Sequence, residues 1–210
     1  MDGVIVDSEP LHKKAYYKMF QDVNIVVSSK IFASFTGQAT LKICQTLCND
    51  FNLRQAPKEL VALKRKHFKY IFENDTDFCL IEGILNLIID YNKNGLKLVL
   101  ASSASMETIN KIFTRFQLDQ YFIAKLSGAD LKASKPHPEI FIKAAKASKF
   151  QKEECLVIED STNGIEAAVN AGIYCVGFDS FHSKNQDYSK ADLVVKKLSQ
   201  ISYKKIKSLV

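Results

Sequence analysis

Four places in this 210-residue chain carry polar side chains whose types suit chemistry on a phosphate group. Two neighbouring carboxylates repel each other unless a cation binds, and Mg²⁺ prefers such oxygen ligands. A hydroxyl at a strand end, with the backbone amides of the next helical turn, can hold a phosphate oxygen. A fixed ammonium can neutralise a phosphate and a carboxylate together. The four places are Asp2, Ser102, Lys135 and the pair Glu159–Asp160.

Asp2 and Ser102 each have a plain structural alternative. Asp2 begins an Asp-Gly pair, which is common in turns of any protein. Ser102 follows the apolar run 96–101 and can cap the helix that comes next. Ser103 and Ser105 would serve equally well as that cap. Because capping and phosphate binding can coexist, the sequence leaves both roles open for Ser102.

Lys135 and the acidic pair stand in more informative surroundings. Lys135 lies in the motif Ser-Lys-Pro-His-Pro, and the two prolines fix where an otherwise ordinary surface lysine points. Glu159–Asp160 follow the apolar run 155–158. Asp160 or the following Ser161 can cap a helix, but two adjacent acids at the end of a buried strand favour a metal site.

These residues fall at the ends of alternating apolar runs and amphipathic segments. The apolar runs predict strands at 96–101, 124–127, 155–158, 174–178 and 192–195. The segments between them predict helices at 83–92, 103–116, 139–148 and 163–171. This alternation predicts an α/β fold with a doubly wound, Rossmann-like parallel sheet, which binds ligands at the carboxyl ends of its strands.

The segment 11–79 has a purely helical pattern. Leu41, Cys44 and Leu47 share one helical face, and Pro57 marks the start of another helix. No run in this segment predicts a strand.

The composition excludes several classes of protein. The net charge of +6 comes from dispersed lysines without the aromatic or zinc-binding patterns of nucleic-acid readers, so we expect no nucleic-acid partner. A mildly positive field also suits an anionic substrate.

No apolar run reaches the roughly 18 residues of a membrane span, and no signal peptide is evident. Five cysteines without paired spacing indicate reduced, apolar thiols. We expect a cytoplasmic monomer without membrane contact.

The motifs, in their order, resemble those of the haloacid dehalogenase-like hydrolases. The first motif of that family reads Asp-x-Asp-Gly-Val, and Asp2-Gly3-Val4 matches its second half. Lys135-Pro136-His137-Pro138 matches the family's lysine motif, and the segment from Glu159 to Gly164 matches its acidic motif. The resemblance covers essentially the whole chain.

This resemblance implies a domain organisation. Residues 1–10 and 80–210 would form the Rossmann-like core, and residues 11–79 would form a small helical cap that closes over the substrate. The family's nucleophilic aspartate corresponds to the position before Met1. Losing about five apolar residues of the strand that leads there would cost on the order of 10 kcal/mol, close to the whole stability of a domain. We therefore expect the native protein to begin several residues upstream.

The resemblance also implies a role for each site residue. In this family an aspartate attacks phosphorus, and water hydrolyses the aspartyl phosphate. Asp2 would act as general acid and base, and its backbone carbonyl would ligate Mg²⁺. Asp160 would bind the metal and Glu159 would support it. Ser102 and Lys135 would hold the phosphoryl oxygens.

Three further residues are candidates for contacting the substrate. The branch most similar to the chain comprises β-phosphoglucomutases and sugar-phosphate phosphatases, and Ser8, His12 and Ala15 match its cap hinge. His12 would orient Asp2 or a sugar, although a partly buried helical histidine is equally ordinary. Lys66 falls near a substrate-contacting lysine of the mutases, although a solvated charge cluster explains it as well. Ser103 is the third candidate.

One departure from the mutases bears on the reaction. After Thr36-Gly37-Gln38-Ala39 the mutases place an arginine that binds the distal phosphate, and this chain has Thr40. We therefore predict a magnesium-dependent phosphatase acting on a small phosphorylated metabolite of the sugar-phosphate class. A hexose-phosphate mutase is the first alternative. An inactive binding protein, suggested by the unmatched nucleophile, is the second.

Overall fold

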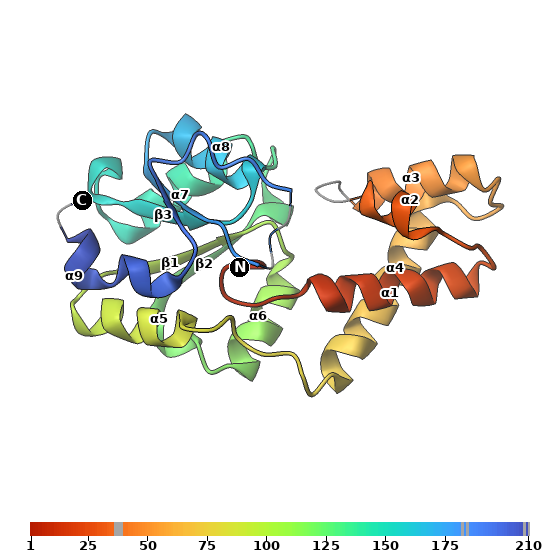
Figure 1. Ribbon diagram of the computed structural model, residues 1–210, viewed down its shortest axis with the longest axis horizontal. Coiled ribbons are helices and arrows are strands. Elements are labelled where there is room, and N and C mark those ends of the chain that lie inside the picture. The colour runs from red at the N-terminus through yellow and green to blue at the C-terminus, as the bar shows by residue number, and fades with distance from the viewer. Residues whose placement is uncertain (36–39, 182, 184, 208, 210) are drawn as a thin grey trace. The chain divides into compact units, whose positions relative to one another are not determined.

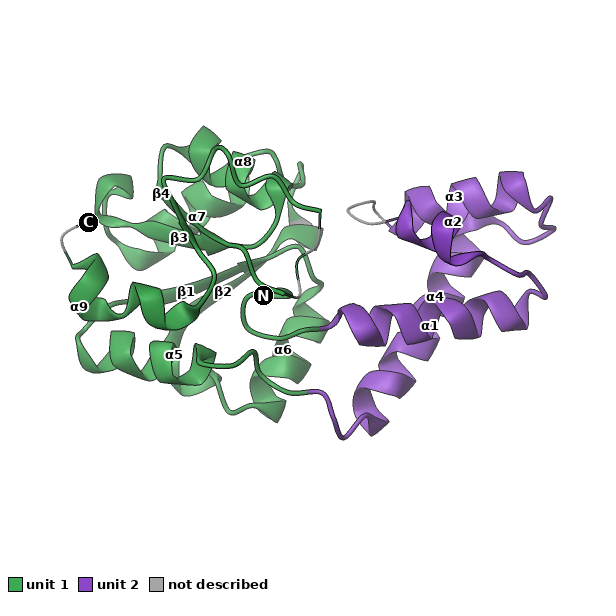
Figure 2. Ribbon diagram, viewed as in Figure 1, with its two compact units in different colours: residues 1–7, 79–210 green, residues 8–78 purple. Residues whose placement is uncertain are grey.

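The computed structural model describes residues 1–35, 40–181, 183, 185–207 and 209 (Figure 1). The chain divides into two compact units, which Figure 2 shows in separate colours. The first unit contains residues 1–7 and 79–210, and the second contains residues 8–78. None of the described helices combines the length and the apolar character that a membrane span requires.

The first unit is built from parallel strands that alternate with helices, so the predicted α/β class is confirmed. Its strands are β1 (Leu98–Ser102), β2 (Phe122–Ser127), β3 (Leu156–Glu159), β4 (Tyr174–Phe178) and β5 (Leu193–Val195). Its helices are α5 (Ile84–Lys93), α6 (Met106–Arg115), α7 (Glu139–Ser148), α8 (Thr162–Ala171) and α9 (Tyr203–Ile206). Short 3₁₀ turns lie at Asp119–Tyr121, Gly128–Asp130, Lys152–Glu154 and Leu198–Ile201.

The strands form two sheets rather than the single sheet that the sequence predicts. β1 pairs with β2, and β3, β4 and β5 pair in that order, with every pairing parallel. Within the described residues, no strand joins the β1 edge to the β3 edge. The apolar runs predicted each strand, but they could not show which strands are neighbours.

Local sequence explains where the helices of this unit begin and end. Ser105 caps α6 and Ser161 caps α8, each by accepting a hydrogen bond from a backbone amide three residues later. Gly172 ends α8 in the left-handed conformation (φ 69°), which glycine adopts without steric cost. Apolar residues of α7 and α8 then pack into one core cluster, which includes Phe141, Ile165 and Cys175.

The described part of the second unit is helical, as the sequence predicts. Its helices are α1 (Glu9–Asp22), α2 (Ser29–Ala33), α3 (Thr40–Asp50) and α4 (Pro57–Asn74). Tyr16, Met19, Leu47 and Leu60 contribute to its own buried core. Residues 36–39, which precede the Thr40 position discussed above, lie outside the described residues.

Candidate active site

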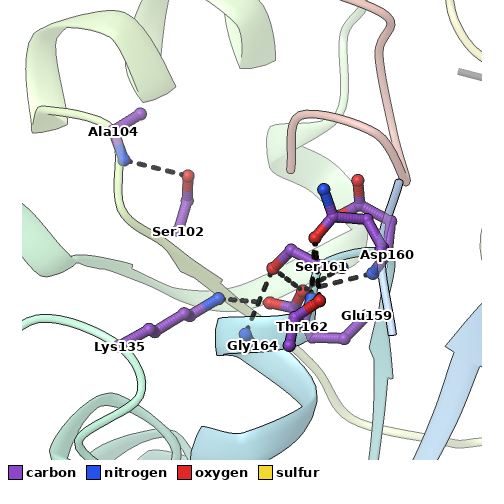
Figure 3. A network of polar contacts seen from close by, with 9 residues as sticks. Ser102, Ala104, Lys135, Glu159, Asp160, Ser161, Thr162 and Gly164 are labelled. Carbon is purple, nitrogen blue, oxygen red and sulfur yellow. Dashed lines mark hydrogen bonds and ion pairs between the residues drawn. The ribbon is translucent and has the colours of Figure 1, made fainter. Parts of the chain in front are cut away.

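Several of the predicted site residues meet at the carboxyl ends of the strands in the first unit. Ser102 is the last residue of β1, and Glu159 is the last residue of β3. Figure 3 shows these two residues in one close-up with Lys135 and Asp160. Parallel strands end at the same edge of an α/β domain, which is why residues far apart in sequence gather here.

Lys135 and Glu159 form a buried ion pair. The Lys135 ammonium contacts Glu159 Oε1, and the two side chains are only 10% and 8% exposed. Nζ also lies 4.7 Å from the centre of the Phe141 ring, a cation–π contact. Burial by itself would raise the pKa of Glu159, but the positive charge of Lys135 holds it below its usual value. Glu159 is therefore charged and fixes the position of the lysine.

The second oxygen of Glu159 is held by the start of α8. Glu159 Oε2 accepts hydrogen bonds from the backbone amides of Asp160 and Ser161, at 3.2 and 3.3 Å, and from the Ser161 hydroxyl at 3.1 Å. A Cβ at Gly164 would lie 2.1 Å from this carboxyl group, so only glycine fits there. With both oxygens engaged inside the protein, Glu159 is suited to positioning Lys135 and Ser161.

Asp160 has a different environment. Its Oδ2 accepts a hydrogen bond of 2.5 Å from the Ser183 hydroxyl, and its backbone carbonyl accepts one of 3.0 Å from the Tyr188 hydroxyl. Burial, followed by the negative charge of Glu159, raises the pKa of Asp160 to about 6. A nearby cation would relieve both effects, because it would stabilise the charged carboxylate.

Asp2 approaches Asp160 through the glycine that follows it. Gly3 has φ +75°, and a Cβ there would lie 1.8 Å from Asp160 Oδ2. The Gly3 amide donates to the Val6 carbonyl at 2.8 Å, which closes a tight turn around the half-buried Asp2. The Asp-Gly pair is therefore a turn, as its structural alternative predicts, and the turn lies against the acidic pair.

Ser102 does not cap the helix that follows β1. Ser105, not Ser102, caps α6, with its hydroxyl accepting from the Thr108 amide at 3.4 Å. Ser102 is 2% exposed, and its hydroxyl oxygen accepts from the Ala104 amide at 3.1 Å. Ser103 is exposed beside it. The Ser102 hydroxyl thus points into the loop after β1 rather than to the helix start.

The structure also shows which of Asp160 and Ser161 caps α8. Ser161 is the residue that caps α8, since its hydroxyl accepts from the Gly164 amide at 3.1 Å. Asp160 is not needed for that cap.

The donor set at this edge is compatible with Mg²⁺. Across the described residues, no three histidine, cysteine or carboxylate side chains come close enough to form a metal centre by themselves. Mg²⁺ usually takes one or two carboxylates and completes its shell with waters, carbonyls and substrate oxygens. Asp160 offers such a carboxylate, and the Asp2 turn brings backbone next to it. The residues present therefore fit a site of this kind.

His12 and Lys66 lie in the second unit, on α1 and α4. Lys66 is exposed, whereas Lys64 is 5% exposed and its ammonium lies 2.8 Å from His12 Nδ1. An ammonium can only donate, so Nδ1 accepts and the ring proton is on Nε2. The His12 ring also stacks on Phe68, with centroids 4.3 Å apart. The lysine that contacts His12 is thus one half-turn earlier than the one the sequence singled out.

The loop after β4 contributes residues that the sequence did not suggest. Ser183 and Tyr188 bind Asp160, and the Gln186 side chain accepts from the Thr162 amide at 2.9 Å and from its hydroxyl at 3.1 Å. This loop also follows the carboxyl end of a strand. The rule that identified Ser102 and Glu159 would have found it if applied to residues 179–192.

The sequence and the fold of the chain are similar to those of known proteins. The family model of the haloacid dehalogenase-like hydrolases matches residues 1–178. A β-phosphoglucomutase from Bacillus subtilis is 27% identical over 207 residues, covering 96% of this chain and 89% of that protein. A 6-phosphogluconate phosphatase from Escherichia coli is 26% identical over 174 residues, covering 82% and 76%. The crystal structure of β-phosphoglucomutase from Clostridium difficile matches with a TM-score of 0.79 at 26% identity, covering 99% of this chain and 92% of that one.

Proposed function

The chain belongs to the haloacid dehalogenase-like hydrolase family, and from this membership we propose that it is a magnesium-dependent phosphatase of a small phosphorylated sugar. The observation that carries the proposal is the buried Lys135–Glu159 pair at the carboxyl end of β3, where Asp160 is the next residue. A lysine held by a charged glutamate keeps its ammonium in place at the edge where a phosphate would bind. The adjacent carboxylate offers an oxygen ligand to a metal ion.

Each residue has a defined part in the proposed reaction, and Asp2 has two. Lys135 and Ser102 bind the phosphoryl oxygens, and Glu159 orients Lys135. Asp160 and the backbone carbonyl of Asp2 would hold Mg²⁺. When bound, the metal would neutralise charge on the phosphoryl group. The Asp2 carboxyl gives its proton to the leaving sugar oxygen and later takes a proton from the attacking water.

The covalent step needs a carboxylate next to this constellation. In the family motif that carboxylate stands in the position before Met1. We propose that these 210 residues form the acid/base, phosphate and metal parts of the site, and that turnover requires an aspartate in the preceding position. The second unit would serve as the cap. His12, Lys64 and Lys66 are its candidate residues for contacting the substrate.

The names of the relatives support a phosphorylated sugar as substrate. One is a 6-phosphogluconate phosphatase and another is a β-phosphoglucomutase. A mutase must hold two phosphates of its intermediate, and Thr40 replaces the arginine expected for the distal one. A threonine cannot offer the two parallel donors of a guanidinium. Hydrolysis is therefore preferred over phosphoryl transfer between two positions of a sugar.

Phosphate release tests the proposal. The chain would be extended by an apolar segment that ends in Asp directly before Met1, and the matched control would end in Asn. Both would be incubated with hexose phosphates, pentose phosphates and 6-phosphogluconate, with Mg²⁺ or with EDTA. We expect release only from the Asp form with Mg²⁺. Equal release by the Asn form would refute the role of the added aspartate as nucleophile. Isomerised sugar phosphate without free phosphate would indicate a mutase.

A further inference from the structure

The segment that follows β4 is fastened to the start of α8. Its described residues within 179–192 contact two residues there, Asp160 and Thr162. Gln186 Oε1 accepts hydrogen bonds from the Thr162 amide at 2.9 Å and from the Thr162 hydroxyl at 3.1 Å. The Asp187 amide donates to the Thr162 hydroxyl oxygen at 2.8 Å. Because Thr162 is the first residue of α8, these bonds anchor the segment on a regular element.

Two buried hydroxyls of this segment lead to the Asp160 carboxylate. Ser180 Oγ donates to Ser183 Oγ at 3.4 Å, and Ser183 Oγ donates to Asp160 Oδ2 at 2.5 Å. The two serines are only 8% and 9% exposed. A charged carboxylate can only accept hydrogen bonds, so the single proton of the Ser183 hydroxyl is committed to Asp160. The carboxylate therefore cannot rotate without breaking a buried hydrogen bond.

The Tyr188 hydroxyl holds the main chain of the same aspartate. It lies 3.0 Å from the Asp160 carbonyl oxygen and 3.4 Å from the Ser183 carbonyl oxygen, and it donates to both. The ring beneath it is fixed by packing, because a Cβ at Gly177 of β4 would lie 3.0 Å from Tyr188 Cδ1. Tyr188 thus keeps the backbones of Asp160 and Ser183 at a set separation.

This arrangement suits an aspartate that has to receive a cation. A ligand that is already oriented loses less conformational freedom on binding than one that must be ordered first. Carboxylates that bind metals are usually held by hydrogen bonds from outer residues, and the loss of such a residue costs about 10–100-fold in metal affinity or activity. Both the side chain and the main chain of Asp160 are held in this way.

We propose that Ser183 and Tyr188 are positioning residues for Asp160, and that they set the affinity of the chain for Mg²⁺. The inference rests on the proposed function, because it takes Asp160 as a ligand of the metal. It extends that function to a segment outside the acidic motif. The bonds of this segment to Thr162 do not involve either hydroxyl, so removing one hydroxyl should disturb Asp160 more than it disturbs the fold.

Titration calorimetry with Mg²⁺ alone tests the proposal without any assay of activity. The full chain would be compared with Ser183→Ala and with Tyr188→Phe, which keeps the packed ring. The titrations would be run at pH 8, because burial raises the pKa of Asp160 to about 6 and the carboxyl is charged above that value. We expect each variant to bind Mg²⁺ about tenfold more weakly than the unsubstituted chain.

Two control variants lose a hydroxyl far from Asp160. Ser148→Ala removes the hydroxyl that donates to the Ala145 carbonyl at 2.7 Å, and Tyr174→Phe removes that of another half-buried tyrosine. Ser148 ends α7 and Tyr174 begins β4, whereas the site lies at the carboxyl ends of the strands. Both controls should bind Mg²⁺ within about twofold of the unsubstituted chain.

Urea unfolding of the same proteins separates positioning from a purely structural role. In EDTA the two site variants should be no less stable than their controls. With saturating Mg²⁺, the ion should stabilise each site variant by about 1.4 kcal/mol less than it stabilises the unsubstituted chain, which is the equivalent of tenfold weaker binding. A larger loss in EDTA than in the controls, or failure of both site variants to fold, would overturn the proposal.

The remaining outcomes distinguish this inference from the proposed function. If the unsubstituted chain and both site variants bind Mg²⁺ equally well, the positioning role is wrong and the proposed metal site stands. If the unsubstituted chain does not bind Mg²⁺, the metal dependence of the proposed function is contradicted, and the positioning role is overturned with it. Each hydroxyl is removed separately, so a single variant that fails to fold leaves the other to decide.

Discussion

Replacing Lys135 by methionine removes the positive charge from the buried pair while keeping a side chain of similar length. The Glu159 side chain is 8% exposed, and the substitution would leave its carboxylate buried without its ammonium partner. Removing one partner of a buried ion pair typically costs about 3–5 kcal/mol. Glu159 keeps three hydrogen bonds from Asp160 and Ser161, so we expect a loss near the lower limit, about 3 kcal/mol.

Urea unfolding in EDTA at pH 7 measures this loss. Lys125→Met is the matched control, because Lys125 pairs with the half-exposed Asp119 at the surface and should cost less than about 1 kcal/mol. The double substitution Lys135→Met with Glu159→Gln removes both charges. Its free energy of unfolding should lie only about 1.5 kcal/mol below that of the unsubstituted protein. A loss for Lys135→Met no larger than for Lys125→Met would refute the assignment of a buried, coupled pair.

The pH dependence of the same variant provides a second check. In the unsubstituted chain the pKa of Glu159 is lowered, so its contribution is present above the unfolded value of about 4.5 and disappears as the pH falls through the folded value. Without Lys135, burial would raise that pKa, and protonation would relieve the buried charge. The stability difference between the two proteins should therefore shrink from pH 7 toward pH 4.5. A constant difference would contradict the electrostatic cause.

Three further predictions concern neighbouring residues. Gly164→Ala should destabilise the chain by more than about 1 kcal/mol in urea, although alanine favours helices, because its Cβ would lie 2.1 Å from the Glu159 carboxyl; an unchanged or higher midpoint would contradict the packing. Ser105→Ala should cost about 1 kcal/mol of stability and leave phosphate binding intact, because Ser105 caps α6. Ser102→Ala should instead weaken phosphate binding. The reverse pattern would return the capping role to Ser102. In the metal-free chain, the raised pKa of Asp160, about 6, means that the folded state binds more protons than the unfolded state, so its contribution to stability should fall as the pH rises from 4 to 6. Asp160→Asn should remove that slope in urea unfolding, and an identical slope in both proteins would show that another group causes it.

Much of the fold was predictable because its signals are local. Helix α7 begins at Glu139 and ends at Ser148 as the sequence predicts, since Pro138 precedes its first turn and its apolar spacing is regular. Strand β4 also has its predicted bounds, because an uninterrupted apolar run defines it. Strand order was not predictable, because pairing depends on contacts between segments far apart in the chain. The division into two sheets is visible only in the structure.

The candidate site was predictable to the extent that strand ends mark it. Lys135, Glu159 and Asp160 were identified because prolines and a buried strand constrain their positions. The strand-end rule points to the loop after β4 as well, but the sequence does not show that Ser183 and Tyr188 are the residues of that loop that contact Asp160. Lys64 was missed in favour of Lys66, since a cluster of three basic residues does not reveal which of them is buried. Burial and side-chain contacts decided each of these cases.

Binding of inorganic phosphate tests the central claim most directly, because it requires the assembled site and no nucleophile. Isothermal titration would compare the 210-residue chain with Lys135→Met, Asp160→Asn and the control Lys125→Met, each with and without Mg²⁺. We predict that phosphate binds the unsubstituted chain and Lys125→Met only when Mg²⁺ is present, and that Lys135→Met and Asp160→Asn each bind at least about tenfold more weakly. Phosphate binding that is independent of Mg²⁺ and unaffected by both site substitutions would contradict the account.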